Sequence, residues 1–413
     1  MNPNIIFESK NVLVRHNVAP SRKLIVITFA GFAGRPSTKL EGFGEKLFSS
    51  YLINCIHITC AGNDWYQYRE MNDVIKAIND VTSSFEKIVT YGSSMGGYAA
   101  ILFSRDLNAD RVLAISPQYS IRKEEAPYEK NWLKNAATIS FINDPATKGA
   151  GGEVTLIYDN QHVDRHHADS IANKFSVRRI TIPFSGHPTS QFLLETGTLK
   201  QMTLDLIWGH CDIEFYRSAW RRNRRKSASY FRALGTSGVG VARKARMLQL
   251  ARALNPTNPD INLPLGEMLL KLNRSSDAAE VFLSAIEQIP WAPWPYHRRA
   301  IALLMSGKYV SAVEMAQKAV EIEPNNPDYL WGLGDAYASV LPSSAIEWYQ
   351  KSLELNTSNS WGWHVLGLHL EKLHLLNDAL RAAEYAVELV PEQQNYRFLV
   401  LRIQMLIENG GSI

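Results

Sequence analysis

The sequence contains little cysteine and no apolar run long enough to cross a membrane. Only three cysteines occur among 413 residues, and their spacing matches no metal site, which argues against a disulfide framework or a zinc-binding fold. The longest apolar runs are strand-length, well short of the roughly 20 residues of a transmembrane helix. The N-terminus lacks the basic flank and apolar core of a secretion signal. These absences predict a cytoplasmic protein with reduced thiols.

Acidic residues are missing from one segment, residues 215–232. The whole chain has a net charge of only +4, but this segment holds seven of its Lys and Arg side chains. Such a run could attract an anionic partner, such as a membrane surface or nucleic acid. No nucleic-acid-binding motif accompanies it, so we expect no nucleic acid partner and interpret residues 213–244 as a solvated, basic helical linker.

Residues 1–212 alternate short apolar runs with amphipathic segments. The runs are rich in β-branched side chains and begin at Val12, Leu24, Leu52, Lys87, Arg111, Glu153 and Val177. Strand–helix alternation of this kind predicts an α/β domain with a mostly parallel, doubly wound sheet that is covered by helices on both faces. Residues 131–151 break the rhythm, and we expect an insertion or loop there, over the edge of the sheet.

Residues 245–413 show a repeat of about 34 residues in place of strands. Four windows align on small, aromatic and proline positions, among them Gly266, Ala278, Phe282, Pro290, Ala300, Ala312, Pro324, Gly334, Tyr337, Ala345, Gly367, Ala379 and Pro391. The pattern resembles the tetratricopeptide repeat family, which implies an all-helical solenoid with a groove for a protein partner. The alternatives are that the array packs on the first half of the chain or mediates dimerisation. Residues 396–408 are typical of a closing helix.

The segment Gly92-Ser93-Ser94-Met95-Gly96 fits the pattern G-x-S-x-G between an apolar run and a helix-like run. Glycines on both sides of a tight strand-to-helix turn remove the Cβ atoms that would clash there. We expect the turn to raise the Ser94 hydroxyl above the edge of the sheet, with Ser93 in a structural role. The alternative is that Ser94 is only a helix-capping residue.

A nucleophilic serine needs a base, and the base needs a carboxylate. His187 follows the apolar run that begins at Val177, in a Gly-His-Pro turn before a helix-like segment. Two acids precede it. Asp159 directly follows a predicted strand, and Asp164 begins a predicted helix. We prefer Asp159 as the triad acid and keep Asp164 as the alternative.

The chain order of serine, acid and histidine resembles that of the α/β-hydrolase family, serine esterase type, over residues 11–209. The resemblance implies an oxyanion hole made by the amide of Met95 and by an amide of an earlier loop, for which Phe32, next to Gly31, is the candidate. Gly31 would also allow close approach of a substrate. Asp64, Trp65 and Tyr66 follow another predicted strand and either line the substrate pocket or anchor their loop in the core.

The sequence therefore predicts a serine hydrolase of the carboxylesterase or deacylase type fused to a tetratricopeptide array at residues 245–413. Its substrate would be an acylated small molecule, saccharide or protein, and we expect no metal or organic cofactor. One alternative is a non-catalytic scaffold that binds a protein partner through the repeats. A further alternative is an acyltransferase that uses the same triad.

Overall fold

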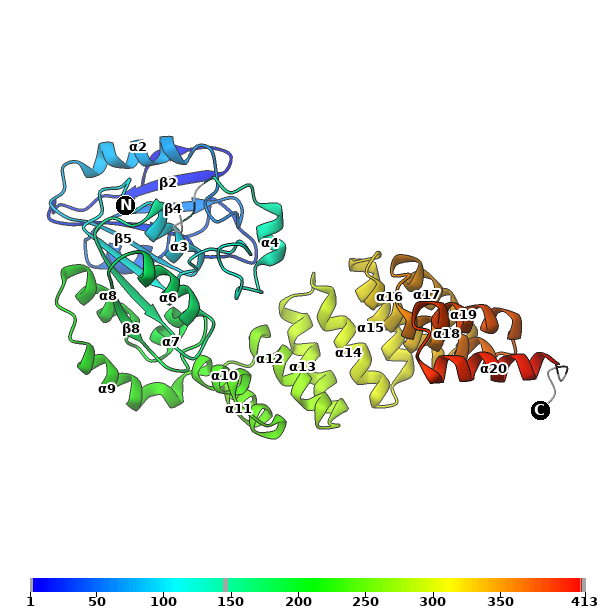
Figure 1. The fold of residues 1–413 in the computed structure, drawn as a ribbon. Coiled ribbons are helices and arrows are strands. Elements are labelled where there is room, and N and C mark those ends of the chain that lie inside the picture. Colours follow the sequence, from blue (N-terminus) through cyan, green and yellow to red (C-terminus); the bar gives the residue numbers. More distant parts are fainter. Residues whose placement is uncertain (1–2, 143, 145–147, 409, 411–413) are drawn as a thin grey trace. The chain divides into compact units, whose positions relative to one another are not determined.

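A computed structural model describes residues 3–142, 144, 148–408 and 410. The chain divides into two compact units, Met1–Gly238 and Val239–Ile413. Figure 1 shows a sheet with surrounding helices in the first unit and helices alone in the second. Part of the predicted insertion at 131–151 lies outside the described residues, and the short helix α4 (Leu133–Thr138) falls within the rest.

Eight strands form one sheet in the first unit, in the order β1-β2-β4-β3-β5-β6-β7-β8. The strands are β1 (Asn4–Glu8), β2 (Val12–Asn17), β3 (Ile25–Phe29), β4 (Asn54–Cys60), β5 (Ile88–Ser93), β6 (Arg111–Ile115), β7 (Glu153–Tyr158) and β8 (Val177–Thr181). Strands β3 to β8 pair in parallel, whereas β2 is antiparallel to both β1 and β4. The sheet is therefore mixed, with parallel pairings throughout from β4 to β8 in that order and antiparallel pairings of β2 with β1 and β4. Strand β1 lies outside the runs that the sequence predicted.

Helices cover both faces of this sheet. Alternate strand residues point to opposite faces, so Ile25 and Ile27 pack in one core while Leu24 and Val26 pack in the other. The first core includes residues of α2 (Met71–Thr82), α3 (Met95–Leu102) and α6 (Asp164–Lys174). The second includes residues of α1 (Glu45–Ser50), α7 (Thr189–Glu195), α8 (Leu199–Trp208) and α9 (Ile213–Asn223). Cys55 and Cys60 are buried, free thiols within these cores.

Of the segment predicted to be a linker, residues 213–238 belong to the sheet unit. They form α9, the short 3-10 helix η1 (Arg224–Lys226) and α10 (Ala228–Ser237). Trp220 is buried in the second core and donates a hydrogen bond to Thr198. Glu195 of α7 accepts hydrogen bonds from the hydroxyls of Ser227 and Ser229 at the start of α10. The interpretation of this segment as a solvated linker is therefore corrected. The basic side chains of α9 are exposed or half-buried, but its buried aromatic side chains pack in the core of the sheet unit.

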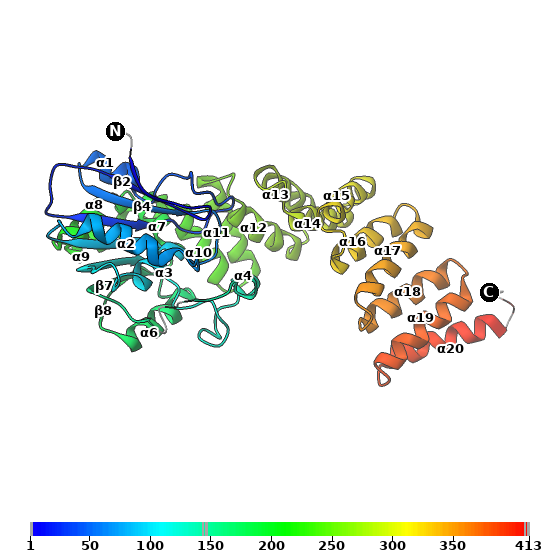
Figure 2. The same ribbon diagram turned by 90° about the horizontal axis from the view of Figure 1, so that it is seen from above.

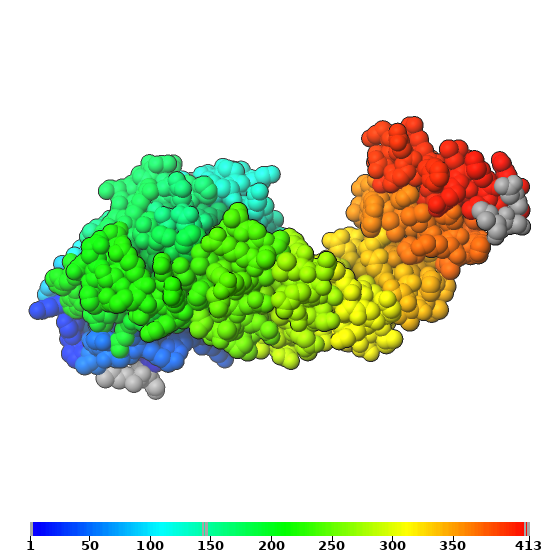
Figure 3. All heavy atoms as spheres, turned by 90° about the horizontal axis from the view of Figure 1, so that it is seen from below, coloured from blue at the N-terminus to red at the C-terminus, as the bar shows by residue number. Residues whose placement is uncertain are grey.

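The second unit is built from consecutive antiparallel helical hairpins (Figure 2). Its helices are α11 (Val241–Leu254), α12 (Pro259–Lys271), α13 (Ser275–Gln288), α14 (Pro293–Met305), α15 (Tyr309–Ile322), α16 (Pro327–Ala338), α17 (Pro342–Leu355), α18 (Ser360–Lys372), α19 (Leu376–Leu389) and α20 (Gln394–Glu408). Asn or Pro residues begin several of them, as at Asn258, whose side chain caps α12. Figure 3 shows the yellow-to-red surface of these repeats as a continuous array of packed side chains. No helix among the described residues is long and apolar enough to span a bilayer.

Small residues let the helices of each hairpin touch. Phe282 of α13 is fully buried. A Cβ atom on Gly266 of α12 would lie 2.4 Å from its ring. The same relation recurs two hairpins on, where a Cβ atom on Gly334 would lie 2.6 Å from the ring of Tyr349. In these two hairpins, a glycine of the first helix therefore meets an aromatic ring of the second.

Gly266→Ala should destabilise the repeats by about 1–3 kcal/mol, because the added methyl group overlaps the Phe282 ring. In a Phe282→Leu background the same substitution should be neutral or stabilising, because alanine favours a helix by about 1 kcal/mol over glycine. Chemical denaturation followed by helical circular dichroism measures both differences. An equal cost of Gly266→Ala in the two backgrounds would contradict this packing.

Candidate functional site

Ser94 lies at the turn between β5 and α3, in a backbone conformation that side chains rarely adopt. Its φ is 55° and its ψ is −121°. A Cβ atom on Gly92 would lie 2.1 Å from the carbonyl oxygen of Gly96, and one on Gly96 would lie 2.3 Å from that of Phe29. Both positions require glycine. The strain at Ser94 is therefore imposed by close packing of strand and helix, and it sets the direction of the serine side chain.

The hydroxyl of Ser94 faces the imidazole of His187. The Oγ atom lies 2.9 Å from Nε2, which is hydrogen-bond distance and suits proton transfer. Ser93 instead shares a hydrogen bond of 2.9 Å with the hydroxyl of Ser190. The guanidinium of Arg232 donates to the carbonyl oxygen of His187 at 2.8 Å, so α10 helps to position the histidine. The structure thus brings together the serine and histidine that the sequence singled out.

Asp164, and not Asp159, contacts the imidazole. Both carboxylate oxygens of Asp164 lie 2.9 Å from Nδ1 of His187. Asp159 instead accepts hydrogen bonds of 2.8 to 3.0 Å from the amides of Gln161, Phe184 and Gly186. Our preference for Asp159 as the partner of His187 is corrected here. Asp159, which directly follows β7, fixes the turn that carries His187. The loop beyond it brings Asp164, the first residue of α6, to the imidazole of His187.

His162 shares the carboxylate of Asp164. Its Nδ1 atom lies 2.9 Å from Oδ1 of Asp164, and its ring stacks on that of His187 with centroids 5.7 Å apart. Burial opposes ionisation of Asp164, but the two imidazoles lower its pKa well below the usual range. Burial alone would lower the pKa of His162, but the hydrogen bond to Asp164 and the negative charges of Asp164 and Asp159 together raise it above its usual value. Asp164 therefore stays ionised over the pH range in which His162 titrates.

The loop that holds the predicted second oxyanion donor lies against the turn at Ser94. A Cβ atom on Gly31 would lie 3.2 Å from the carbonyl oxygen of Ser93. Asn63 fixes this loop by accepting from the amide of Ala33 and donating to its carbonyl oxygen. The amide of Met95 is the first of α3, and the first amides of a helix have no acceptor within the helix. The geometry therefore places Gly31, the residue before Phe32, beside the turn that carries both Ser94 and Met95.

Trp65 and Tyr66 anchor their loop in the core, which is one of the two roles that the sequence allowed. Trp65 is fully buried, and the hydroxyl of Tyr66 donates to the carbonyl oxygen of Ala30 at 2.8 Å. Asp64 accepts a hydrogen bond from the hydroxyl of Tyr68. A role for Trp65 or Tyr66 as open pocket walls does not fit this burial. Both side chains instead pack against the loop of residues 30–34 from the core side.

Accessible aromatic surface near this loop comes from other residues. The ring of Phe32 is 41% exposed and lies 4.8 Å from that of Trp132. Trp132 belongs to the segment that the sequence predicted as an insertion. The ring of Trp65 lies beneath both, at 6.1 Å from Phe32 and 5.2 Å from Trp132. An apolar group of a ligand would therefore meet Phe32 and Trp132 first.

Gln118 belongs to the site, and the sequence reasoning missed it. Its amide nitrogen donates to Oγ of Ser94 at 3.2 Å, and its side chain is almost fully buried. Its Oε1 atom is buried and has no hydrogen-bond partner within the described chain, so it is available to a donor on a ligand. The available signal was position alone, since Gln118 follows β6 at the edge of the sheet where β5 ends.

His162, Asp164 and His187 also offer the donor types of a metal site. One ligand atom from each lies within 4.8 Å of the others, and histidine and carboxylate are common zinc ligands. A metal at this point would use the Nδ1 atom of His187, which here lies at hydrogen-bond distance from Asp164. The two uses of His187 exclude each other. The hydrogen-bonded arrangement leaves its Nε2 atom directed at Ser94.

A model of the tetratricopeptide repeat family matches residues 297–360. MamA from Desulfovibrio magneticus is 20% identical, with a TM-score of 0.36, and the match covers 41% of this chain and 96% of that one. YrrB, described as a TPR protein with an unusual peptide-binding site, is 15% identical, with a TM-score of 0.39 over 46% and 98% of the two chains. A thermophilic TPR protein of Thermus thermophilus is 18% identical, with a TM-score of 0.36 over 44% and 100%. On the family match, the chain carries a tetratricopeptide repeat region.

The contact between His162 and Asp164 predicts a pH-dependent contribution to stability. Because the pKa of His162 is raised in the folded state, its contribution is fully present below its unfolded pKa and is lost as the pH rises through the folded value. The loss in free energy of unfolding caused by His162→Gln should therefore be larger at about pH 5.5 than at about pH 8. Thermal or chemical denaturation at the two pH values measures it.

His166→Gln is the matched control, since this neighbouring histidine of α6 is exposed and its ring lies against Tyr128. Its effect should change less with pH. A His162→Gln effect that is constant with pH, or larger at the alkaline end, would contradict the ion pair.

Proposed function

We propose that the first unit is a serine hydrolase that acts on carboxylic esters or thioesters. The observation that carries the proposal is the hydrogen-bonded chain from Ser94 to His187 to Asp164, with separations of 2.9 Å at each step. A nucleophile, a base and an orienting acid in this order and geometry are recognised by their mutual contacts and not by their sequence positions. The strained turn at Ser94, between a strand and a helix, has the form of a nucleophile elbow.

In the proposed reaction, Oγ of Ser94 attacks the carbonyl carbon of the substrate while Nε2 of His187 takes the hydroxyl proton. Ionised Asp164 stabilises the resulting imidazolium and keeps its Nδ1–H directed toward the carboxylate. The negative charge on the former carbonyl oxygen would be met by the amide of Met95 and, in our proposal, by that of Phe32. One such donor typically contributes about 3 kcal/mol of transition-state stabilisation.

Collapse of this intermediate breaks the bond to the leaving group, which takes the proton from His187. An acyl-enzyme on Ser94 remains. Water, deprotonated by His187, then attacks the acyl carbon. The bond between that carbon and Oγ of Ser94 breaks, Oγ takes the proton back from His187, and a carboxylic acid leaves and ionises. If another hydroxyl replaces water the outcome is acyl transfer, and the same residues serve both reactions. Phe32 and Trp132 favour a substrate with an apolar acyl group or a sugar ring at this point, because exposed aromatic faces bind both.

The second candidate function is protein interaction through the repeats, and the family match at residues 297–360 favours it. Tetratricopeptide arrays present extended surfaces that suit partner binding, and YrrB is described as having a peptide-binding site. We propose that the repeats recruit a protein partner to the hydrolase unit. A scaffold with no catalysis would keep this role and lose the chemistry. We also propose that the protein works in the cytoplasm.

A fluorophosphonate probe should label the wild-type protein at Ser94 and should not label Ser94→Ala. Ser93→Ala is the matched control, because its hydroxyl bonds to Ser190 and not to His187, and it should retain labelling. Turnover of p-nitrophenyl acetate should fall by as much as about 10⁶ in Ser94→Ala. Mass spectrometry locates the adduct. A wild-type protein that neither labels nor turns over would favour the scaffold.

Asp164→Asn should lower turnover far more than Asp159→Asn. The first change removes the ionised partner of His187, and a corresponding change in a serine protease lowers turnover by about 10⁴. The second leaves an oxygen that still accepts from the amides of Gln161 and Phe184 but turns an NH2 group toward the amide of Gly186. We therefore expect a loss of about tenfold or less, with part of it seen as lower stability. Steady-state kinetics on p-nitrophenyl acetate measures both, and the reverse ranking would overturn the assignment.

A further inference from the structure

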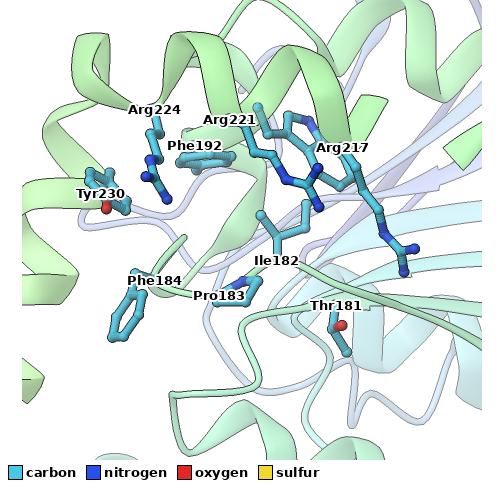
Figure 4. A pocket seen from close by; sticks show the side chains of 10 residues that line it. Thr181, Ile182, Pro183, Phe184, Phe192, Arg217, Arg221, Arg224 and Tyr230 are labelled. Atoms are coloured by element: carbon cyan, nitrogen blue, oxygen red, sulfur yellow. The ribbon is translucent and has the colours of Figure 1, made fainter. Parts of the chain in front are cut away.

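A cavity of about 390 Å³ lies in the first unit between the end of β8, helix α7 and the basic segment α9–η1–α10 (Figure 4). Its lining residues are Thr181, Ile182, Pro183, Phe184, Phe192, Arg217, Trp220, Arg221, Arg224 and Tyr230. Sites for small organic ligands fall in the range of about 300–1,000 Å³. The cavity is therefore large enough for a small molecule, and it contains none of the residues that surround Ser94.

The base of this cavity is apolar. Ile182, Phe192 and Trp220 are each at most 5% exposed and belong to the second core of the sheet unit. Pro183 and Phe184 extend the apolar surface toward solvent, and the ring of Tyr230 closes one side. A hydrocarbon or aromatic group placed here would be removed from water, at a gain of about 25 cal/mol per Å² of apolar surface buried.

Three arginines line the same cavity, and they differ in how far their charge is neutralised. Arg217 forms an ion pair with Glu214. The guanidinium of Arg224 lies over the ring of Tyr230, 5.5 Å from its centroid. Neither Arg221 nor Arg224 has a carboxylate partner in the part of the chain that the structure describes, and no acidic residue lines the cavity. Figure 4 shows the side chain of Arg221 reaching toward Ile182 and that of Arg224 reaching toward the space between Tyr230 and Phe192.

We propose that this cavity binds a small amphiphilic anion, with a phosphate or carboxylate head held by Arg221 and Arg224 and an apolar body seated on Ile182, Phe192 and Trp220. Guanidinium groups present paired N–H donors that match the oxygens of these anions. An extended polyanion, such as nucleic acid, would use the whole basic run and would have no need of the buried apolar base. This site is distinct from the proposed hydrolysis and does not depend on it.

Isothermal titration calorimetry of the full-length protein with phenyl phosphate tests the site. Phenyl phosphate should bind measurably, and more tightly than inorganic phosphate, because only the former also buries an apolar ring. Phenol, which lacks the anion, should show no measurable binding at the same concentrations. Arg221→Ala and Arg224→Ala should each weaken phenyl phosphate binding by about tenfold, as expected for the loss of one hydrogen bond to a charged group.

Arg222→Ala is the matched control, because Arg222 is an exposed arginine of α9 that does not line the cavity. It should change the affinity by less than about twofold. An effect equal to that of Arg221→Ala would overturn the proposal in favour of a general basic surface. Equal affinity for inorganic and phenyl phosphate, or no binding of phenyl phosphate, would overturn it as well. Fluorophosphonate labelling of each variant shows separately whether the site at Ser94 is intact.

Discussion

The first unit depends on one buried carboxylate, that of Asp164, which lies between two imidazoles. A buried charge without partners is strongly destabilising, whereas one that is fully hydrogen-bonded holds its partners in place. Asp164 is 3% exposed and contacts Nδ1 of both His162 and His187. The contact between this carboxylate and Nδ1 orients His187 so that Nε2 lies at hydrogen-bond distance from the hydroxyl of Ser94. Asp159 acts one step further back, since its contacts with the amides of Phe184 and Gly186 fix the turn that carries His187.

Much of the fold was predictable because its signals are local. The strands from β2 to β8 are apolar runs, and the repeats recur at a spacing that a sequence shows directly. Gly266 and Phe282 were identified as small and large positions, and they meet in the structure. Strand β1 was not predictable in this way, because its residues are mostly exposed or half-buried. The packing of α9 on the sheet unit was not predicted, because most of the side chains that stand out in this segment are basic. Its burial depends on two aromatic residues, Tyr216 and Trp220, which lie in the second core.

The contact between Ser94 and His187 was predictable, and the residues that surround them were less so. Glycine spacing around Ser94 indicates a tight turn, and the Gly-His-Pro turn after a strand indicates that His187 lies at the same edge of the sheet. The choice between Asp159 and Asp164 depends on the path of a loop, which composition does not reveal. Gln118 carries no motif at all. The arrangement of arginines over an apolar base follows from the docking of α9 and α10, so it too appears only in three dimensions.

The most direct test of this account is proton NMR of the imidazole N–H groups. A strongly deshielded N–H signal, assigned to His187 by its absence in His187→Gln, reports a hydrogen bond from Nδ1 to an ionised carboxylate. We expect this signal to be present in the wild-type protein, to be lost or shifted upfield in Asp164→Asn, and to persist in Asp159→Asn. A His187 signal that is indifferent to Asp164→Asn, or that disappears only in Asp159→Asn, would contradict it.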